Sequence, residues 1–367
     1  MRVLLSGTSN AIIARGVNYP LARDPRITSF ANHSYGASGT VALGDHLRDI
    51  DFSQYDFCVL DYCVNEEVFI SINESTTDMA MNNLLAAVDA ASLAGCQPLI
   101  VILPTSTRIN YPRPFENAIM DELAARCVPV FNFYAFANDF AAQTGISFDQ
   151  QFLDPMHIHR EIGAAIGTAL IDYMAERIET APTLTPLART YDPVDFVPYT
   201  AFQVKGDAQE VTRESSLMSR DCLEILPGAE ITITGPCAGS VTGISFDASR
   251  SVGTISSDQS DRACLSLKPA SAFFRTTRSL TQMTIPIPAP VALDGDHKAT
   301  LRYTFEGALS DIHPPATMTL SGVSLRCTGC ARPVHVLCRD EIPCSLADWL
   351  PRDRWDALAI QLQDHIK

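Results

Sequence analysis

Short, continuously apolar runs alternate with helix-like segments through the first half of the chain. Such runs occupy residues 3–6, 56–61, 98–103 and 128–131, with a weaker one at 26–30. Continuous apolar runs of this length are typical of strands that are covered on both faces, as in a parallel sheet. The pattern therefore predicts a buried parallel sheet in this part of the protein.

The segments between these runs have the periodicity of helices. Residues 79–94, followed by Gly95 as a stop signal, and residues 114–126 are helical candidates. A third begins near Ile158, where apolar residues recur every four positions. Strand–helix alternation of this kind predicts a flavodoxin-like, three-layer α/β/α domain over residues 1–178, with its site at the carboxyl ends of the strands.

The texture of the chain changes after this domain. Four prolines in residues 179–199 predict a stiff linker. Residues 200–350 then show many short segments in which apolar and polar positions alternate, separated by turn dipeptides, and this pattern predicts a β-sandwich accessory domain. Residues 351–367 have helical spacing and predict a C-terminal helix.

Composition and charge narrow the possible partners. Of the 367 residues, 46% are hydrophobic and 19% are charged, which is typical of a globular protein with a full core. The formal net charge of −15 repels nucleic acid and anionic membrane surfaces. No segment has the length of a membrane span or of a signal-peptide core, so we expect a soluble, cytoplasmic protein. No pattern predicts an oligomeric state.

The eleven cysteines favour reduced thiols over a disulfide framework, because their number is odd. Four of them form a cluster that offers a second interpretation, a closed structural zinc site with His335 as a substitute ligand. The cluster consists of Cys327, Cys330, Cys338 and Cys344. Only its first pair has the spacing of a zinc knuckle, so we favour reduced thiols and predict neither a catalytic metal nor an organic cofactor.

Ser9 is the first candidate for chemistry. It follows the first predicted strand after a Gly-Thr turn and precedes an apolar segment, residues 11–14, that suits the start of a helix. A hydroxyl at such a place is exposed near backbone N–H groups that favour developing negative charge. Ser9 or Asn10 is equally suited to cap that helix, and this alternative stays open.

Two further segments follow strands that should end at the same edge of the sheet. The loop at residues 32–39 contains Gly36 and Gly39, where a backbone N–H can approach a substrate closely. Asn65 follows the strongest predicted strand, and its amide can donate to an oxyanion. Each segment is also compatible with an ordinary turn.

Asp154 and His157 precede the last predicted helix of the first domain. A carboxylate three residues before an imidazole, with Pro155 between them, can hold the ring in one tautomer. Together with Ser9 they would supply the nucleophile, the base and the orienting acid of acyl transfer. The alternative is that Asp154 caps the helix and His157 lies in its first turn.

The order of these four segments resembles the SGNH (GDSL-type) hydrolase family, whose sequence blocks carry a Ser, a Gly, an Asn and an Asp-x-x-His. The resemblance covers residues 1–178. It implies that Ser9 is the nucleophile, His157 the general base and Asp154 the acid that orients it. It also implies an oxyanion hole made by the Ser9 N–H, the Gly36 N–H and the Asn65 amide, with Gly36 preferred over Gly39.

Two blocks depart from the usual family pattern. The first reads Gly-Thr-Ser-Asn, with Thr8 in place of an Asp, and the third reads Val-Asn-Glu. The first variant is similar to members found among bacterial polysaccharide-biosynthesis proteins. The resemblance implies a serine esterase that removes acyl groups, above all acetyl, from a carbohydrate. A carbohydrate O-acetyltransferase that uses the same acyl-serine and a non-catalytic glycan-binding or assembly protein remain the alternatives.

Overall fold

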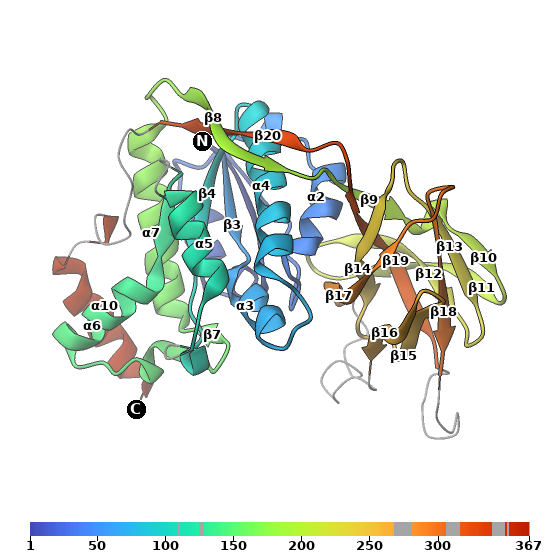
Figure 1. Ribbon diagram of the computed structural model, residues 1–367. Helices are drawn as coiled ribbons and strands as arrows, with labels where there is room; N and C mark the ends of the chain where they lie inside the picture. The colour runs from blue at the N-terminus through green and yellow to red at the C-terminus, as the bar shows by residue number, and fades with distance from the viewer. Residues whose placement is uncertain are drawn as a thin grey trace.

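The computed structural model describes residues 1–108, 111–124, 128–267, 280–305, 316–339, 349–350 and 352–366. An α/β domain at the N-terminal end of the chain is followed by a β-rich domain that lies beside it (Figure 1). In the part of the chain that the structure describes, one strand and one helix after the β-rich domain return to the first domain.

Five parallel strands form the central sheet of the α/β domain, in the order β2-β1-β3-β4-β5. They are β1 (Arg2–Gly7), β2 (Ser29–Asn32), β3 (Phe57–Asp61), β4 (Gln97–Ile102) and β5 (Val130–Asn132). The three central strands are buried along almost their whole length, as their continuous apolar sequence predicts. In sheets with this strand order, ligands bind beyond the carboxyl ends of the strands.

Helices cover both faces of this sheet. They are α1 (Asn18–Leu21), α2 (Leu43–Asp49), α3 (Cys63–Ser71), α4 (Thr77–Leu93), α5 (Pro114–Glu122), α6 (Phe133–Thr144), α7 (Arg160–Arg177) and α10 (Asp353–Ile366). Successive side chains of a strand point to opposite faces. Val3 and Leu5 therefore join the core under α6, α7 and α10, whereas Leu4 joins the core under α2 to α5. Figure 1 shows α7 and α4 on opposite sides of the sheet.

Helix α7 confirms the helix that the four-residue spacing predicted. Ile162, Ile166, Leu170 and Met174 are all fully buried. On a neighbouring face, Gly167 allows α7 to lie directly against α1, since a Cβ atom there would be 2.5 Å from the Val17 carbonyl oxygen. None of the described helices is long and apolar enough to cross a membrane.

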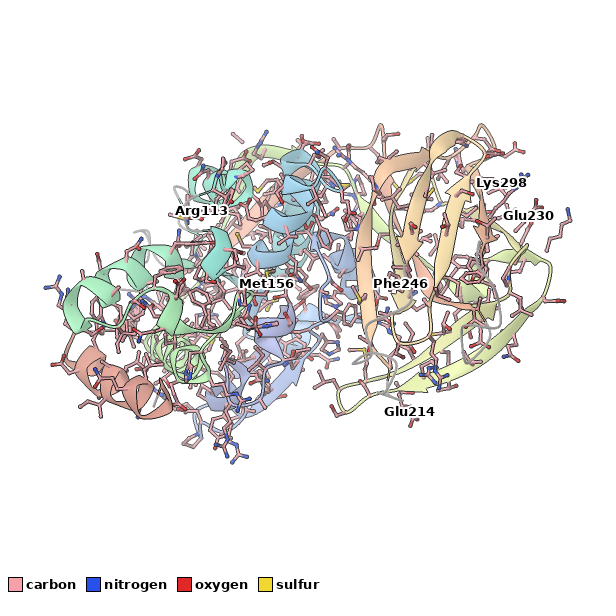
Figure 2. All side chains as sticks on the ribbon, turned by 90° about the horizontal axis from the view of Figure 1, so that it is seen from below. Arg113, Met156, Glu214, Glu230, Phe246 and Lys298 are labelled. Carbon is pink, nitrogen blue, oxygen red and sulfur yellow. A yellow bond between two sulfur atoms is a disulfide. The ribbon has the colours of Figure 1, made fainter. Side chains whose placement is uncertain are left out.

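Two antiparallel sheets share one hydrophobic core in the β-rich domain. The first contains β10 (Gln203–Lys205), β13 (Glu230–Thr234), β18 (Lys298–Thr304), β15 (Gly253–Ser257) and β16 (Ser260–Leu267). The second contains β11 (Ala208–Glu214), β12 (Ser219–Ile225), β19 (Met318–Cys327), β14 (Gly239–Asp247) and β17 (Gln282–Ala292), with β9 (Val194–Pro198) beside β19. Ile231 of the first sheet and Phe246 of the second both belong to this core, whereas Lys298 lies at its outer side (Figure 2).

The segment expected to be a linker, residues 179–199, contains strands instead. Its first strand, β8 (Thr183–Tyr191), pairs with β20 (Arg332–Cys338), and both cover α4 (Figure 1). Leu187 and Val336 join the core on that face of the α/β domain. Proline restricts φ to a value that an extended chain can adopt, and edge strands tolerate it. The prolines that suggested a linker are therefore also compatible with a two-stranded ribbon.

A disulfide joins Cys237 to Cys327, so the expectation of reduced thiols is wrong for these two residues. The pairing of β14 with β19 places Gly239 opposite Cys327 and thereby brings Cys237 within 6.0 Å of Cys327, measured between Cα atoms. A sulfur in a disulfide offers no thiolate to zinc, so this structure does not form the four-cysteine zinc set. Cys344 lies outside the described residues, and those residues contain no group of three or more metal-binding side chains.

Buried polar contacts fix the two domains to each other. Arg220 of β12 forms ion pairs with Asp45, whose side chain is fully buried, and with Asp49 at 2.9 Å. The same guanidinium donates to the hydroxyl of Tyr35. The Thr284 N–H of β17 also donates to the Ser38 hydroxyl at 2.8 Å. Separating Arg220 from the buried Asp45 would leave an unpaired charge inside the protein, which is costly. These contacts therefore hold the loop after β2 against the β-rich domain.

Replacing Gly167 with Ala tests the close contact between α7 and α1. Alanine favours the helix by about 1 kcal/mol, but its methyl group would force two backbones apart, and overpacking costs roughly 1–3 kcal/mol. We expect Gly167→Ala to lower the melting temperature. Thr168→Ala, the control at the next position, should not lower it. A Gly167→Ala protein that melts at a higher temperature would contradict the packing described here.

Candidate active site

Ser9 lies just beyond the carboxyl end of β1. A Cβ atom at Gly7 would be 2.8 Å from the Asp61 carbonyl oxygen, so glycine allows β1 and β3 to approach closely before the turn. Residues Ser9–Ala11 form a single 3-10 turn, and the next helix, α1, begins only at Asn18. The helix expected from residue 11 is absent: the 3-10 turn ends at Ala11 with Ile12 as its C-cap, and Arg15, whose φ is 66°, lies outside helical geometry. Ser9 does not cap a helix.

His157 and Asp154 lie on a short hairpin, β6 (Phe152–Asp154) and β7 (His157–Ile158). The Nε2 atom of His157 is 2.8 Å from the Ser9 hydroxyl oxygen. Its Nδ1 atom is 2.9 and 2.8 Å from the two carboxylate oxygens of Asp154. The structure thus brings together three side chains whose sequence positions span 148 residues. Asp154 does not cap α7, because that helix begins at Arg160 with His159 as its N-cap.

Asp154 is held by its own turn. One of its carboxylate oxygens accepts the backbone N–H groups of Met156 and His157, at 2.9 and 3.1 Å. Burial acts to raise the pKa of this carboxyl, but the hydrogen bonds from His157 and Met156 outweigh it, so the pKa lies below its ordinary value. A charged Asp154 is an acceptor only, and His157 therefore carries its proton on Nδ1 and accepts from Ser9 at Nε2.

Asn10 joins the two halves of this arrangement. Its amide nitrogen donates to the Met156 carbonyl at 3.3 Å, and its amide oxygen accepts the Ile158 N–H at 3.1 Å. These two contacts lie on either side of His157 in the chain. Asn10 is 1% exposed, so both contacts are shielded from water. Sequence reasoning treated Asn10 only as a possible cap, because nothing local shows a partner 148 residues away.

The two glycines of the loop after β2 differ in their surroundings. Gly36 borders the same cavity as Ser9 and His157. The N–H of Gly39 instead donates to the Thr284 carbonyl at 3.2 Å, and a Cβ atom there would lie 2.7 Å from a Glu66 carboxylate oxygen. The geometry therefore leaves Gly36 as the loop glycine at the candidate site.

Asn65 lies in the first turn of α3 rather than at the end of the strand. Its amide donates to the Ser38 carbonyl at 3.1 Å, so it supports the loop that carries Gly36. Asn65 is 7% exposed and does not border the cavity. The structure thus connects Asn65 to the candidate site through this loop.

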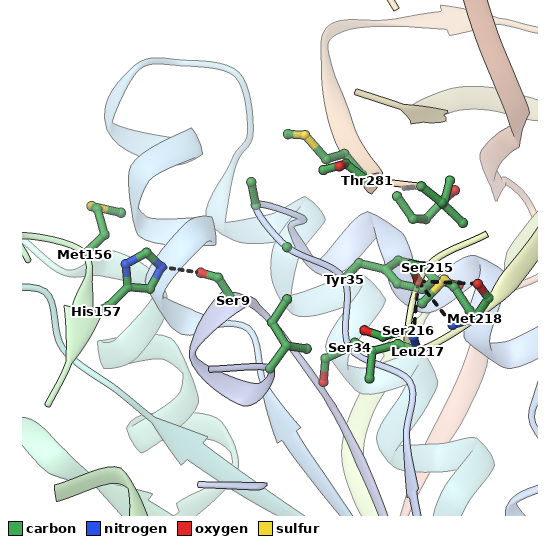
Figure 3. Close-up of a pocket in the computed structure, with 16 residues that line it drawn as sticks. Ser9, Ser34, Tyr35, Met156, His157, Ser215, Ser216, Leu217, Met218 and Thr281 are labelled. Atoms are coloured by element: carbon green, nitrogen blue, oxygen red, sulfur yellow. Dashed lines mark hydrogen bonds between the residues drawn. The ribbon is translucent and has the colours of Figure 1, made fainter. Parts of the chain in front are cut away.

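A cavity of about 660 Å³ opens over Ser9 and His157, between the two domains. Figure 3 shows the Ser9–His157 contact on one side and the turn at residues 215–218 of the β-rich domain across from it. Tyr35, which Arg220 contacts, also lines the cavity. The pattern of apolar residues in the sequence could not reveal that the β-rich domain lines the cavity, because this depends on how the two domains pack.

Asp61, like Asn10, is a buried polar residue that the sequence analysis did not identify as part of the site. It ends β3, is 2% exposed and accepts the Thr8 hydroxyl at 3.4 Å. Burial raises its pKa to about 7, although the hydrogen bond from Thr8 opposes the shift. The carboxyl group therefore favours its neutral form inside the fold.

No protein-family model matches this sequence, and no curated protein matches it. Its fold is similar to that of two crystal structures of a two-domain esterase active on acetylated mannans, one of them co-crystallised with mannopentaose. Both are 14% identical in sequence and cover 90% of this chain and 92% of that chain, with TM-scores of 0.60 and 0.58. At this identity the likeness shows a common fold, and it extends over both domains.

The pKa of Asp61 predicts how stability depends on pH. A buried carboxyl with a raised pKa stabilises the fold at acidic pH, and this contribution is lost as the pH rises through about 7. Asp61→Asn mimics the neutral form at every pH. We expect the variant to gain on the order of 2 kcal/mol in free energy of unfolding relative to the natural protein between pH 5 and pH 8. Urea denaturation at both pH values measures this difference, and an equal difference at both would contradict the assignment.

Proposed function

We propose that this protein is a serine esterase that removes acyl groups from a carbohydrate. The observation that carries the proposal is the continuous chain of contacts from the Ser9 hydroxyl through His157 to Asp154, with Ser9 and His157 lining a cavity. Nucleophile, base and orienting acid need this arrangement for acyl transfer. The four sequence blocks that resemble the SGNH family contribute the same residues in the same order, which supports the proposal.

The tautomer of His157 sets the direction of proton movement. Nε2 takes the proton of Ser9 as its oxygen attacks the ester carbonyl, and the positive imidazole is stabilised by Asp154. Collapse of the tetrahedral intermediate expels the alcohol, which receives the proton from Nε2, and leaves an acyl-serine. Water then attacks this intermediate with His157 again as base, so the acid is released and the Ser9 hydroxyl is restored.

Two groups that border the cavity are proposed to stabilise the oxyanion, the backbone N–H groups of Ser9 and Gly36. The Asn65 amide, which the family resemblance implies as a third donor, donates to the Ser38 carbonyl and does not border the cavity. We therefore propose that Asn65 acts on the oxyanion hole by holding the loop that carries Gly36. Each such donor is worth about 10²–10³ in kcat in a comparable site.

The carbohydrate part of the proposal is supported by the arrangement of both domains. The two-domain esterase with the same fold is described as active on acetylated mannans. In the present chain, residues of both domains line the cavity over Ser9. We therefore propose an acylated carbohydrate as the substrate, with acetyl as the simplest acyl group.

Replacing Ser9 with Ala tests the nucleophile. With 4-nitrophenyl acetate and with an acetylated oligosaccharide, we expect the natural protein to release acetate and the variant to lose at least roughly 10³-fold in kcat, because no acyl-serine can form. Ser53→Ala, on the exposed turn before β3, is the control and should keep the natural rate. Retention of activity by Ser9→Ala would remove the proposal.

Replacing Asn10 with Ala tests how His157 is positioned. The variant loses both hydrogen bonds that flank His157, and a misplacement of about 1 Å costs on the order of 10²-fold in rate. We expect kcat to fall by roughly 10- to 100-fold, while circular dichroism shows an intact fold. Asn18→Ala, at the start of α1, serves as control. If the Asn10→Ala variant has the same kcat as the natural protein, the Asn10 amide does not position His157.

A further inference from the structure

Apolar side chains form most of the cavity wall beyond Ser9 and His157. They come from both domains and meet over the candidate nucleophile. The α/β domain supplies Ile12 and Met156, and the β-rich domain supplies Leu217, Met218, Leu280 and Met283. The lining residues that the structure describes include no Asp, Glu, Lys or Arg, and their polar side chains, among them Ser34, Thr281 and Gln282, are uncharged. The described wall therefore offers more apolar contact surface than hydrogen-bonding groups.

The size of the cavity also exceeds what an acetyl group needs. Its volume of about 660 Å³ falls in the range of roughly 300–1,000 Å³ that accommodates a drug-sized ligand. A sugar ring placed there would turn part of its hydroxyl groups toward Ile12, Met156 and the apolar side chains of the β-rich domain, and buried polar groups without partners are costly. The apolar part of the ester is therefore the better occupant.

The turn that carries Leu217 is held in one conformation. The Ser215 hydroxyl accepts the N–H groups of Leu217 and Met218, both at 3.2 Å. The Ser215 N–H donates to the Met218 carbonyl at 2.8 Å. Leu217 is nevertheless 46% exposed at the rim of the cavity. Because the turn is fixed, an apolar ligand that covers Leu217 removes its exposed apolar surface from water, and this burial favours binding.

Methionine contributes three of the side chains that line the cavity, Met156, Met218 and Met283. Its side chain is unbranched and adapts to ligands of different shape. Such a wall suits flexible alkyl chains better than one rigid group.

We propose, on the basis of the esterase function proposed above, that this cavity binds the acyl chain of the substrate and that this chain is longer than acetyl. The alcohol part is a carbohydrate and is polar, so the acyl group is the part of the ester that matches the apolar wall. The sugar then lies outside this cavity.

A series of 4-nitrophenyl esters tests the chain length. Acetate, butyrate, hexanoate and octanoate share one alcohol and differ only in the acyl chain. Each buried CH₂ contributes a factor of about four, so we expect kcat/KM to rise by at least tenfold from acetate to hexanoate. A flat profile or one that is highest for acetate would overturn the inference.

A second series separates the acyl chain from the alcohol. Acetate esters of ethanol, butanol and hexanol keep the acetyl group and lengthen the alcohol. We expect kcat/KM to change little along this series. A steep rise here, together with a flat acyl series, would show that the cavity binds the alcohol and would overturn the inference.

Leu217→Gln tests the wall directly, because it keeps the size of the side chain and makes it polar on an exposed turn. We expect the ratio of kcat/KM for hexanoate to that for acetate to fall at least fivefold. Leu226→Gln, an exposed leucine on the turn between β12 and β13 that does not line the cavity, should leave this ratio as in the natural protein. An unchanged ratio in Leu217→Gln would show that the chain binds elsewhere.

The two proposals fail in different ways. If the natural protein hydrolyses neither series of esters faster than the Ser9→Ala variant does, the esterase function itself is wrong. If esters are hydrolysed through Ser9 but acetate is preferred, the esterase function stands and only the long acyl chain is wrong.

Discussion

The hydrogen bonds of Asn10 are the constraint on which the candidate site depends. Ser9 and His157 are brought to the sheet edge by different parts of the chain, and neither part alone determines their distance. The Asn10 amide holds the backbone on both sides of His157, directly beside the turn that carries Ser9. Because this amide is buried, an incorrect pairing would leave its polar groups unsatisfied. These two hydrogen bonds support the 2.8 Å contact between Ser9 and His157.

The β-rich domain holds the loop with Gly36 in place and forms part of the cavity wall. Arg220 fixes Tyr35 and the fully buried Asp45, and Thr284 fixes Ser38, so the loop with Gly36 is held from the side of the β-rich domain. The same packing places the turn at Leu217 across the cavity from Ser9. The sheet edge therefore supplies the chemistry, and the contact between domains supplies the shape of the cavity.

The sequence was sufficient for the features that depend on local pattern. Continuous apolar runs predicted the buried strands, and the spacing from Ile162 to Met174 predicted α7. It was insufficient where distant segments meet. The partners of Asn10 and the Cys237–Cys327 pairing depend on tertiary contacts, and the prolines of residues 179–199 suit a linker and an edge strand equally well. The four blocks named Ser9, Asp154 and His157, but the wall of the cavity could not be seen without the β-rich domain.

Covalent labelling shows whether Ser9 is an activated nucleophile, because it reports the reactive residue without any choice of ester substrate. A fluorophosphonate loses fluoride when an activated serine oxygen attacks its phosphorus, and peptide mass spectrometry identifies the modified residue. We expect a single adduct on Ser9 that is lost in His157→Ala. An adduct on another residue, or labelling of Ser9 that does not depend on His157, would contradict this expectation.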